Sequence, residues 1–125
     1  MNQSKNGYQD NIEEETLANS DYRRVLYTGD NMQLVLMSLA PGEEIGAEVH
    51  REHDQFFRFE AGKGKVIIDG EELLVGDGDA VIVPAGSEHN VINVSEQEDL
   101  RLYTIYAPPE HPAGTVHHTK ADAKE

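Results

Sequence analysis

The sequence predicts an all-β fold in one domain, and three observations support this. Runs of β-branched and aliphatic residues, such as RRVLYT (residues 23–28) and MQLVLMSL (residues 32–39), recur along the middle of the chain. About eight such runs follow one another at the roughly 8–12-residue spacing typical of sandwiches and barrels. No long helical pattern lies between them, and 125 residues suffice for one domain with a core.

The breaks between these runs carry the residues that favour turns. Gly-Asp-Asn at 29–31 and Pro-Gly-Glu-Glu at 41–44 bound the second run. The segment IIDGEELLV is typical of a β-hairpin with Asp69-Gly70 at its tip. The remaining predicted strands are QFFRFEAG (55–62), GKVIIDGEELLVG (64–76, the hairpin), DAVIVPAG (79–86), HNVINV (89–94) and DLRLYTIYAPP (99–109).

Polar segments flank the predicted barrel, which we place at residues 23–107. Residues 1–22 form an N-terminal arm whose one helical signal is IEEETLAN, and they contain no apolar stretch typical of a signal peptide. Residues 108–125 form a C-terminal arm that begins with two prolines, which remove ladder donors. We expect this arm either to be disordered or to lie across the barrel or a partner subunit.

Charge and composition exclude several classes of partner. The net charge is −14, and the predicted barrel is itself acidic, so a polyanion such as nucleic acid would be repelled. No apolar run approaches membrane-spanning length, and the cytoplasm is the default location. The absence of Cys excludes disulfides and thiolate metal ligands. A small anionic substrate is compatible with this net negative charge, because one buried arginine can make the electrostatic potential of a binding site locally positive.

The stretch EVHREHDQFF provides the first half of a candidate metal site. Side chains alternate between faces along a strand, so Glu48 and His50 share one face. Gln55 begins the next run and shares its face with Phe57 and Phe59. Glu48, His50 and Gln55 can therefore converge inside a barrel, beside two apolar rings.

The second half lies in the segment GDAVIVPAGSEHNVIN. Pro84 and Gly86 indicate a sharp turn, after which His89, Val91 and Asn93 share a face. His89 is thus the fourth candidate ligand. The alternative is a set of buried polar groups satisfied by hydrogen bonds alone. Because burial of these groups together is costly without a cation, we favour the metal site.

These residues resemble the two conserved motifs of the cupin family, the small double-stranded β-helix or jelly-roll barrel. The resemblance covers residues 42–93. The first motif matches in its spacing at Gly42, Glu48, His50, Gln55 and Gly62. The second motif matches at every defined position, namely Gly78, Pro84, Gly86, His89 and Asn93.

Two ligand positions depart from the commonest cupin pattern. Glu48 stands at the first His position, and Gln55 stands at the usual Glu position. The resemblance therefore implies one divalent transition metal (Mn, Fe, Co, Ni or Zn) held by two imidazoles, a carboxylate and an amide. The cupin domain of mannose-6-phosphate isomerases is similar, with a Gln-x-His pair followed by Glu, so that Glu and Gln are exchanged here.

Other residues are candidates for contact with a small-molecule substrate. His53 and Glu52, in the loop before Gln55, are weak candidates for a catalytic base. Arg101, Arg51 and Arg58 could hold an anionic substrate, although by parity Arg58 points away from Gln55. The predicted substrate contacts are Phe57, Phe59, Asn93, Arg101 and Tyr103. His111, His117 and His118 are expected in a solvated tail.

Three functions fit this pattern. The first is a metal-dependent enzyme for a small polar metabolite, with an isomerase-like ligand set. The second is an Fe(II) or Mn dioxygenase. The third is a non-catalytic binding or sensor protein, because the cupin fold hosts many functions. Outward-facing Phe56 and Val49 would suit the dimer contact that is common among cupins, so we expect a homodimer.

Overall fold

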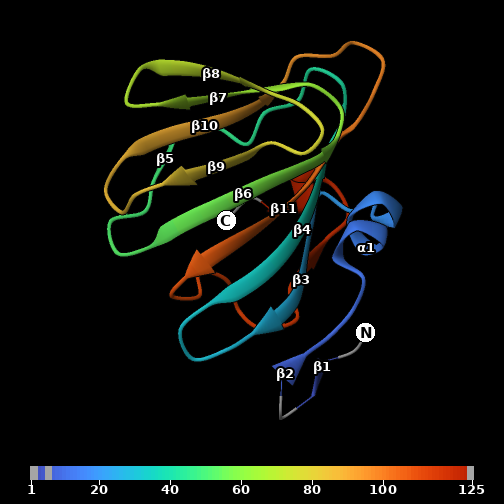
Figure 1. Cartoon of the computed structure of the whole chain (residues 1–125), viewed down its shortest axis with the longest axis vertical. Coiled ribbons are helices and arrows are strands. Elements are labelled where there is room, and N and C mark those ends of the chain that lie inside the picture. The colour runs from blue at the N-terminus through green and yellow to red at the C-terminus, as the bar shows by residue number, and fades with distance from the viewer. Residues whose placement is uncertain (1–2, 5–6, 124–125) are drawn as a thin grey trace.

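The computed structural model describes residues 3–4 and 7–123 of the chain. Strands dominate, and the one α-helix is short (Figure 1). The bounds are β1 Gln3–Ser4, β2 Gly7–Tyr8, α1 Ile12–Ala18, β3 Arg23–Thr28, β4 Gln33–Leu39, β5 Glu48–Val49, β6 Asp54–Ala61, β7 Gly64–Ile68, β8 Glu71–Val75, β9 Ala80–Val83, β10 Glu88–Asn93, β11 Leu100–Ala107, β12 Val116–His117 and the 3-10 helix η1 Lys120–Ala123. None of the described helices is long and apolar enough to cross a membrane.

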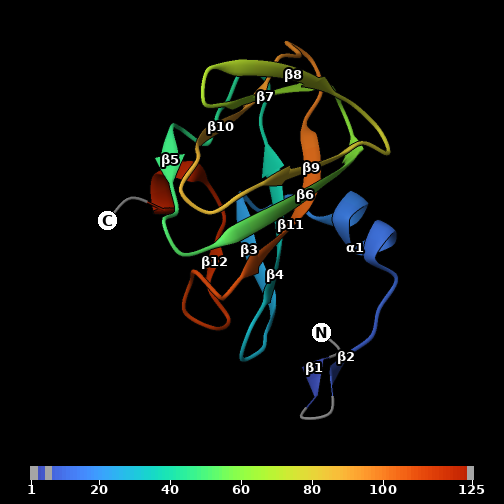
Figure 2. The ribbon, with the colours of Figure 1, turned by 60° about the vertical axis from the view of Figure 1, so that its left-hand side comes forward.

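The strands form two antiparallel sheets that enclose the core (Figures 1 and 2). One sheet has six strands in the order β12-β3-β4-β11-β6-β9, and the other has four in the order β5-β10-β7-β8. A separate small sheet pairs β1 with β2. This double-sheet arrangement confirms the predicted all-β jelly roll.

Alternation along the strands sorts residues between the core and the outer face. On β6, Gln55, Phe57 and Phe59 are buried, whereas Phe56 and Arg58 are partly exposed. This is the parity that the sequence predicts. The fully enclosed core side chains come from both sheets and include Val35, Met37, Leu39, Phe57, Phe59, Val66, Val91, Leu100 and Leu102.

Local turn and cap residues explain the shorter elements. Asp69 and Gly70 connect β7 to β8 with φ values of 48° and 88°, as expected for a two-residue hairpin turn with positive φ at both positions. Asn11 caps α1, since its side-chain oxygen accepts a hydrogen bond from the Glu14 amide at 2.9 Å. The helix packs on the outer face of the six-stranded sheet against β4, β6 and β11, where Leu36 is buried.

The C-terminal arm lies across the barrel. β12 forms the edge of the six-stranded sheet beside β3, with Val116 opposite Arg24 and His117 opposite Arg23. Figure 2 shows the end of the arm beside β5. At that point the Lys120 ammonium donates to the backbone carbonyl of Glu44. The arm therefore covers one end of the barrel, which is the end that carries the polar cluster described below.

Candidate metal centre

Strand pairing brings the two sequence motifs together. β5 and β10 are antiparallel neighbours, and His89 lies opposite Glu48 in their register. His50 follows β5 and shares the inner side with Glu48, whereas Val49 between them is exposed. The predicted pairing of Glu48, His50 and His89 is thus produced by backbone hydrogen bonds between strands that are distant in sequence.

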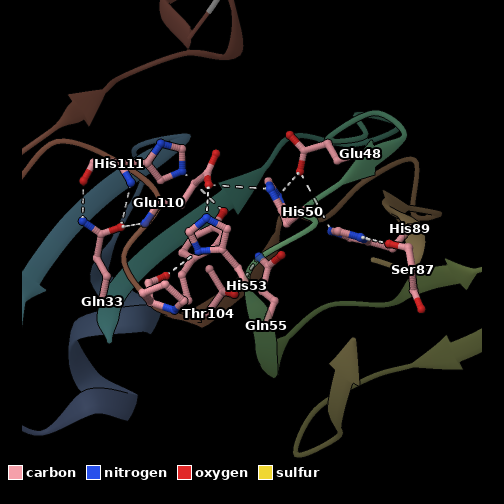
Figure 3. A network of polar contacts seen from close by, with 12 residues as sticks. Gln33, Glu48, His50, His53, Gln55, Ser87, His89, Thr104, Glu110 and His111 are labelled. Atoms are coloured by element: carbon pink, nitrogen blue, oxygen red, sulfur yellow. Dashed lines mark hydrogen bonds and ion pairs between the residues drawn. The ribbon is translucent and has the colours of Figure 1, made fainter. Parts of the chain in front are cut away.

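Potential metal-ligating atoms of Glu48, His50 and His89 lie close together (Figure 3). The Glu48 carboxylate oxygen Oε1 lies 3.2 Å from Nε2 of His50 and 4.0 Å from Nε2 of His89. One donor atom from each residue lies within 4.8 Å of the other two. Metal ligands around one ion lie at comparable mutual distances, given bonds of about 2.0–2.2 Å. The arrangement needs only small adjustment to hold a cation.

His89 is prepared as a neutral ligand. Its Nδ1 donates to the Ser87 carbonyl at 3.3 Å, which leaves the lone pair on Nε2. This Nε2 is buried and has no hydrogen-bond partner among the described residues. Burial lowers the pKa of His89, and the nearby His50 adds to this effect. A neutral imidazole with a buried, unshared lone pair is the form that binds a metal.

Glu48 and His50 stabilise each other's charged forms. Burial opposes ionisation of Glu48, but the hydrogen bond from His50 and the charges of the two imidazoles and of Arg23 lower its pKa. The same hydrogen bond raises the pKa of His50, against the effect of its burial. A cation would take the place of the His50 proton, because it satisfies the same carboxylate.

Gln55 directs an amide oxygen to the same interior. Its Nε2 donates to Thr104 Oγ1 at 3.0 Å, and that hydroxyl donates in turn to the Phe56 carbonyl at 2.8 Å. This chain assigns the amide orientation. The remaining Oε1 is buried and has no hydrogen-bond partner among the described residues. Gln55 therefore offers the oxygen that a fourth ligand needs.

The C-terminal arm contributes Glu110, which the sequence analysis did not identify. Its Oε1 lies 3.0 Å from Nε2 of His53 and 3.7 Å from Nδ1 of His50 (Figure 3). His53 Nδ1 donates to the Pro108 carbonyl at 2.6 Å. Glu110 thus faces the ring nitrogen of His50 that is not directed at Glu48, the position of an outer carboxylate behind a metal-bound imidazole.

Gln33 holds the arm in this position. Its Oε1 accepts from the amides of Glu110 and His111 at 3.1 and 3.0 Å, and its Nε2 donates to the His111 carbonyl at 2.7 Å. Gln33 is fully buried at the start of β4. In the sequence, Gln33 stands out only as an amide side chain at the start of an apolar strand. Nothing in the sequence indicates that it binds the backbone of Glu110 and His111.

Two predicted base candidates have different surroundings. Glu52 lies in the exposed turn before β6, and no hydrogen bond or ion pair joins it to the cluster in the described part of the chain. His53 is close, with its ring centroid 5.8 Å from that of His50. However, both of its ring nitrogens face the arm, at Pro108 and Glu110.

The predicted substrate contacts separate into two groups. Phe57 borders the cluster, with its ring centroid 6.1 Å from that of His89, and Phe59 stacks behind it. Asn93 lies at the far end of β10, where its amide donates to the carbonyls of Leu39, Ala40 and Glu98. The hydrogen bonds of the Asn93 side chain go to backbone groups at this end of the barrel, so we place Asn93 outside the candidate site.

Arg101 and Tyr103 lie on the outer face of β11. The buried side chains of this strand are Leu100, Leu102, Thr104 and Tyr106, the alternate positions. Arg101 donates to the Leu17 carbonyl of α1, and the Tyr103 ring lies 6.2 Å from that of Phe56. Neither can reach the interior cluster, which corrects the expectation that they contact a substrate there. Arg58 also lies outward, as predicted.

The three tail histidines are docked rather than free. His111 Nε2 lies 3.4 Å from the Tyr106 hydroxyl, and His117 Nδ1 lies 3.3 Å from Arg23 Nη1. His118 Nδ1 lies 2.7 Å from the Asp21 carboxylate. The expectation of a solvated tail is wrong for this segment, although the His118 ring itself remains largely exposed.

A jelly roll with a His/Glu cluster assembled from these two motifs defines a cupin. The family model "Cupin domain" matches residues 35–106, so the chain belongs to the cupin family. The crystal structure of BH2720 from Bacillus halodurans superposes with a TM-score of 0.93 at 45% identity, over 98% of this chain and 96% of that one.

Two relatives match most of this chain, and neither name states an activity. The uncharacterized protein YrkC of Bacillus subtilis is 49% identical over 90% of this chain, and the uncharacterized protein L612 of Acanthamoeba polyphaga mimivirus is 44% identical over 85%. The chain spans 63% of the first and 68% of the second.

Relatives whose names state an activity are more distant. Quercetin 2,3-dioxygenase of Bacillus subtilis is 32% identical over 62% of this chain and 23% of its own length. Pectin degradation protein KdgF of Dickeya dadantii is 28% identical over 66% of this chain and 74% of its own. Mannose-1-phosphate guanylyltransferase of Escherichia coli is 31% identical over 52% of this chain and 14% of its own.

Proposed function

We propose that this cupin binds one divalent transition metal through Glu48, His50 and His89, with Gln55 as a fourth ligand, and acts on a small polar metabolite. The observation that carries the proposal is a pair of buried acceptor atoms, Nε2 of His89 and Oε1 of Gln55, that have no hydrogen-bond partner among the residues that the structure describes. Each would cost on the order of 1–3 kcal/mol if left unsatisfied. A cation beside Glu48 would satisfy both at once.

The donor set matches a metal with open coordination positions. Two imidazoles, one carboxylate and one amide suit Mn, Fe(II), Co, Ni or Zn. Such a metal polarises an oxygen of a bound substrate. Phe57 would exclude water on one side, and Glu110 would orient His50. This arrangement supports an isomerase-like reaction, which is our first candidate function.

A dioxygenase is the second candidate, because a relative named quercetin 2,3-dioxygenase is 32% identical over 62% of this chain. The two reactions differ in their requirements. An isomerase works without oxygen and tolerates several divalent metals, whereas a dioxygenase requires oxygen and a redox-active metal. Substrate turnover under nitrogen therefore separates them. Ligand-induced thermal stabilisation without turnover would indicate the third function, a binding protein.

Elemental analysis of the purified, tag-free protein tests the metal site. Protein loaded with Mn, Fe, Co, Ni or Zn should retain about one metal ion per chain after desalting. Glu48→Ala, His50→Ala and His89→Ala should each lose it. His53→Ala, which removes a neighbouring imidazole that faces the arm, is the matched control and should retain it. Retention of metal by the His89→Ala variant would contradict the proposed site.

A further inference from the structure

Arg23 is a buried cation that the proposed metal site does not use. It is the first residue of β3, and only 6% of its surface is exposed. In the sheet it lies opposite Met37 of β4, a fully enclosed core residue. Its side chain therefore points into the barrel, unlike that of Arg24, which is partly exposed and forms an ion pair with Asp21.

Arg23 forms no ion pair with a carboxylate of the described residues. Among the described residues, no Asp or Glu oxygen lies within 4.0 Å of its guanidinium nitrogens. Its Nη1 donates to Nδ1 of His117 at 3.3 Å, and the guanidinium lies over the Tyr22 ring at 5.2 Å. Its Nε is buried, and no described residue gives it a hydrogen-bond partner. Burial of a charge without a counter-ion costs free energy, and a bound anion beside Arg23 would reduce that cost.

A cavity adjoins this guanidinium. It has a volume of about 340 Å³, and its lining includes Arg23, Lys120 and Ile45 together with Glu48 and Glu110. Glu48 is one of the proposed metal ligands, so the cavity leads from Arg23 to the candidate metal centre.

A structural role alone does not account for Arg23. Its hydrogen bond to His117 helps to dock β12, but a neutral donor would serve that purpose without a buried charge. Lys120 also has no carboxylate partner among the described residues, since its ammonium donates to the Glu44 carbonyl. Within the described part of the chain, Arg23 and Lys120 thus line one cavity without an ion pair to a carboxylate, although Glu48 and Glu110 border the same space and the net charge of the protein is −14.

We propose that this cavity binds a small metabolite through a carboxylate or phosphate group held by Arg23, with Lys120 at the entrance. A guanidinium presents paired N–H donors that match either oxyanion. The inference deepens the proposed function, on which it rests for the placement of the ligand's other end near the metal. Because Arg23 is not a proposed metal ligand, anion binding can be measured in the metal-free protein.

NMR detection of the Arg23 Nε–H signal tests the anion site directly. Inorganic phosphate and malonate are titrated separately into the chelator-treated wild-type protein at constant ionic strength, with glycerol as an uncharged control. Arg23 should respond saturably to one or both anions and not to glycerol. The anion that binds more tightly identifies the class of group. Absence of a saturable response to either anion would overturn the inference.

Arg23→Gln, which keeps amide donors for His117, should weaken anion binding at least about tenfold, because a charge-assisted contact is lost. Arg24→Gln is the matched control and should bind as tightly as the wild type. Both variants should still retain about one metal ion, which separates failure of the anion site from failure of the metal site. Equal affinity of Arg23→Gln and wild type would refute the role of Arg23. If Arg23→Gln does not fold, the wild-type NMR titration still decides the question.

Discussion

His89 lies opposite Glu48 across the antiparallel pair of β10 and β5, with its unshared Nε2 lying 4.0 Å from the Glu48 carboxylate. One backbone register therefore places an imidazole from the second cupin motif against a carboxylate from the first. The register also leaves the His89 lone pair buried without a hydrogen-bond partner among the described residues. The candidate metal centre is a consequence of how these two strands pair.

Gln55 should affect how tightly the metal is held. Gln55→Leu removes the amide oxygen while filling the same space, so the metal affinity should fall by about tenfold or more. Gln55→Glu offers a charged oxygen and should hold the metal more tightly than the wild type. Chelator competition measures both affinities. An unchanged affinity in Gln55→Leu would exclude Gln55 as a ligand.

Glu110 should act on the metal site through His50. Because its carboxylate lies 3.7 Å from His50 Nδ1, Glu110→Gln should reduce metal affinity by about 10- to 100-fold without abolishing binding. Glu52→Gln removes an exposed carboxylate from the nearby turn and serves as the control. The same competition assay compares the two variants. A loss of equal size in Glu52→Gln would indicate a general effect of charge.

His111 should make the metal-free protein less stable in mild acid. Burial, and next the charge of Arg23, lower the pKa of His111 to about 4, below its ordinary value near 6.5. The unfolded chain then binds more protons than the folded one between these values, so stability falls as the pH drops from 7 toward 4.

The contribution of His111 is on the order of 2 kcal/mol after its partial exposure is discounted. Urea unfolding measures the free energy of unfolding at pH 7 and at pH 4.5. The decrease between these two pH values should be smaller for His111→Gln than for the wild type. Identical differences for the two proteins would show that His111 does not cause the acid sensitivity.

The contact between Asp21 and His118 should be visible as a coupled titration. The hydrogen bond raises the pKa of His118 and lowers that of Asp21. The His118 contribution is present below its unfolded pKa and is lost as the pH rises through its raised folded value. The Asp21 contribution is lost as the pH falls through its lowered value. The contact is thus strongest between these two limits.

NMR titration of the His118 ring can measure this coupling. In the wild type the midpoint should lie above the ordinary value for histidine, and in Asp21→Asn it should return toward that value. His53, which contacts a different part of the arm, is an internal control. A His118 midpoint that does not respond to Asp21→Asn would show that the tail does not dock through this pair in solution.

Local sequence determined the strands and part of the candidate metal centre. The inward positions of Gln55 and Phe57 follow from the period of two along β6, and the Asp69-Gly70 turn follows from the positive φ that such residues tolerate. The motif spacing around His50 and His89 identified the cupin family, which the family match over residues 35–106 confirms.

Both faces of β11 are covered. The helix α1 packs against the outer face, so apolar residues alternate on both sides and the sequence pattern does not reveal which side faces the interior. Arg101 and Tyr103, expected to contact a substrate, lie on the outer side. The arginine that does face the interior is Arg23, at the boundary where the sequence predicted the barrel to begin.

What the sequence by itself determined is the all-β fold and the shared face of Glu48 and His50, because alternation and turn chemistry are properties of short segments. The cupin motif spacing added His89 as a candidate partner, and the pairing of β5 with β10 places it there. Only the tertiary structure decided where the C-terminal arm lies. Its position depends on hydrogen bonds that the backbone amides of Glu110 and His111 donate to the Gln33 side-chain oxygen, which join residues far apart in the chain. No local pattern encodes such contacts, and they are what bring Glu110 to His50 and enclose the cavity beside Arg23.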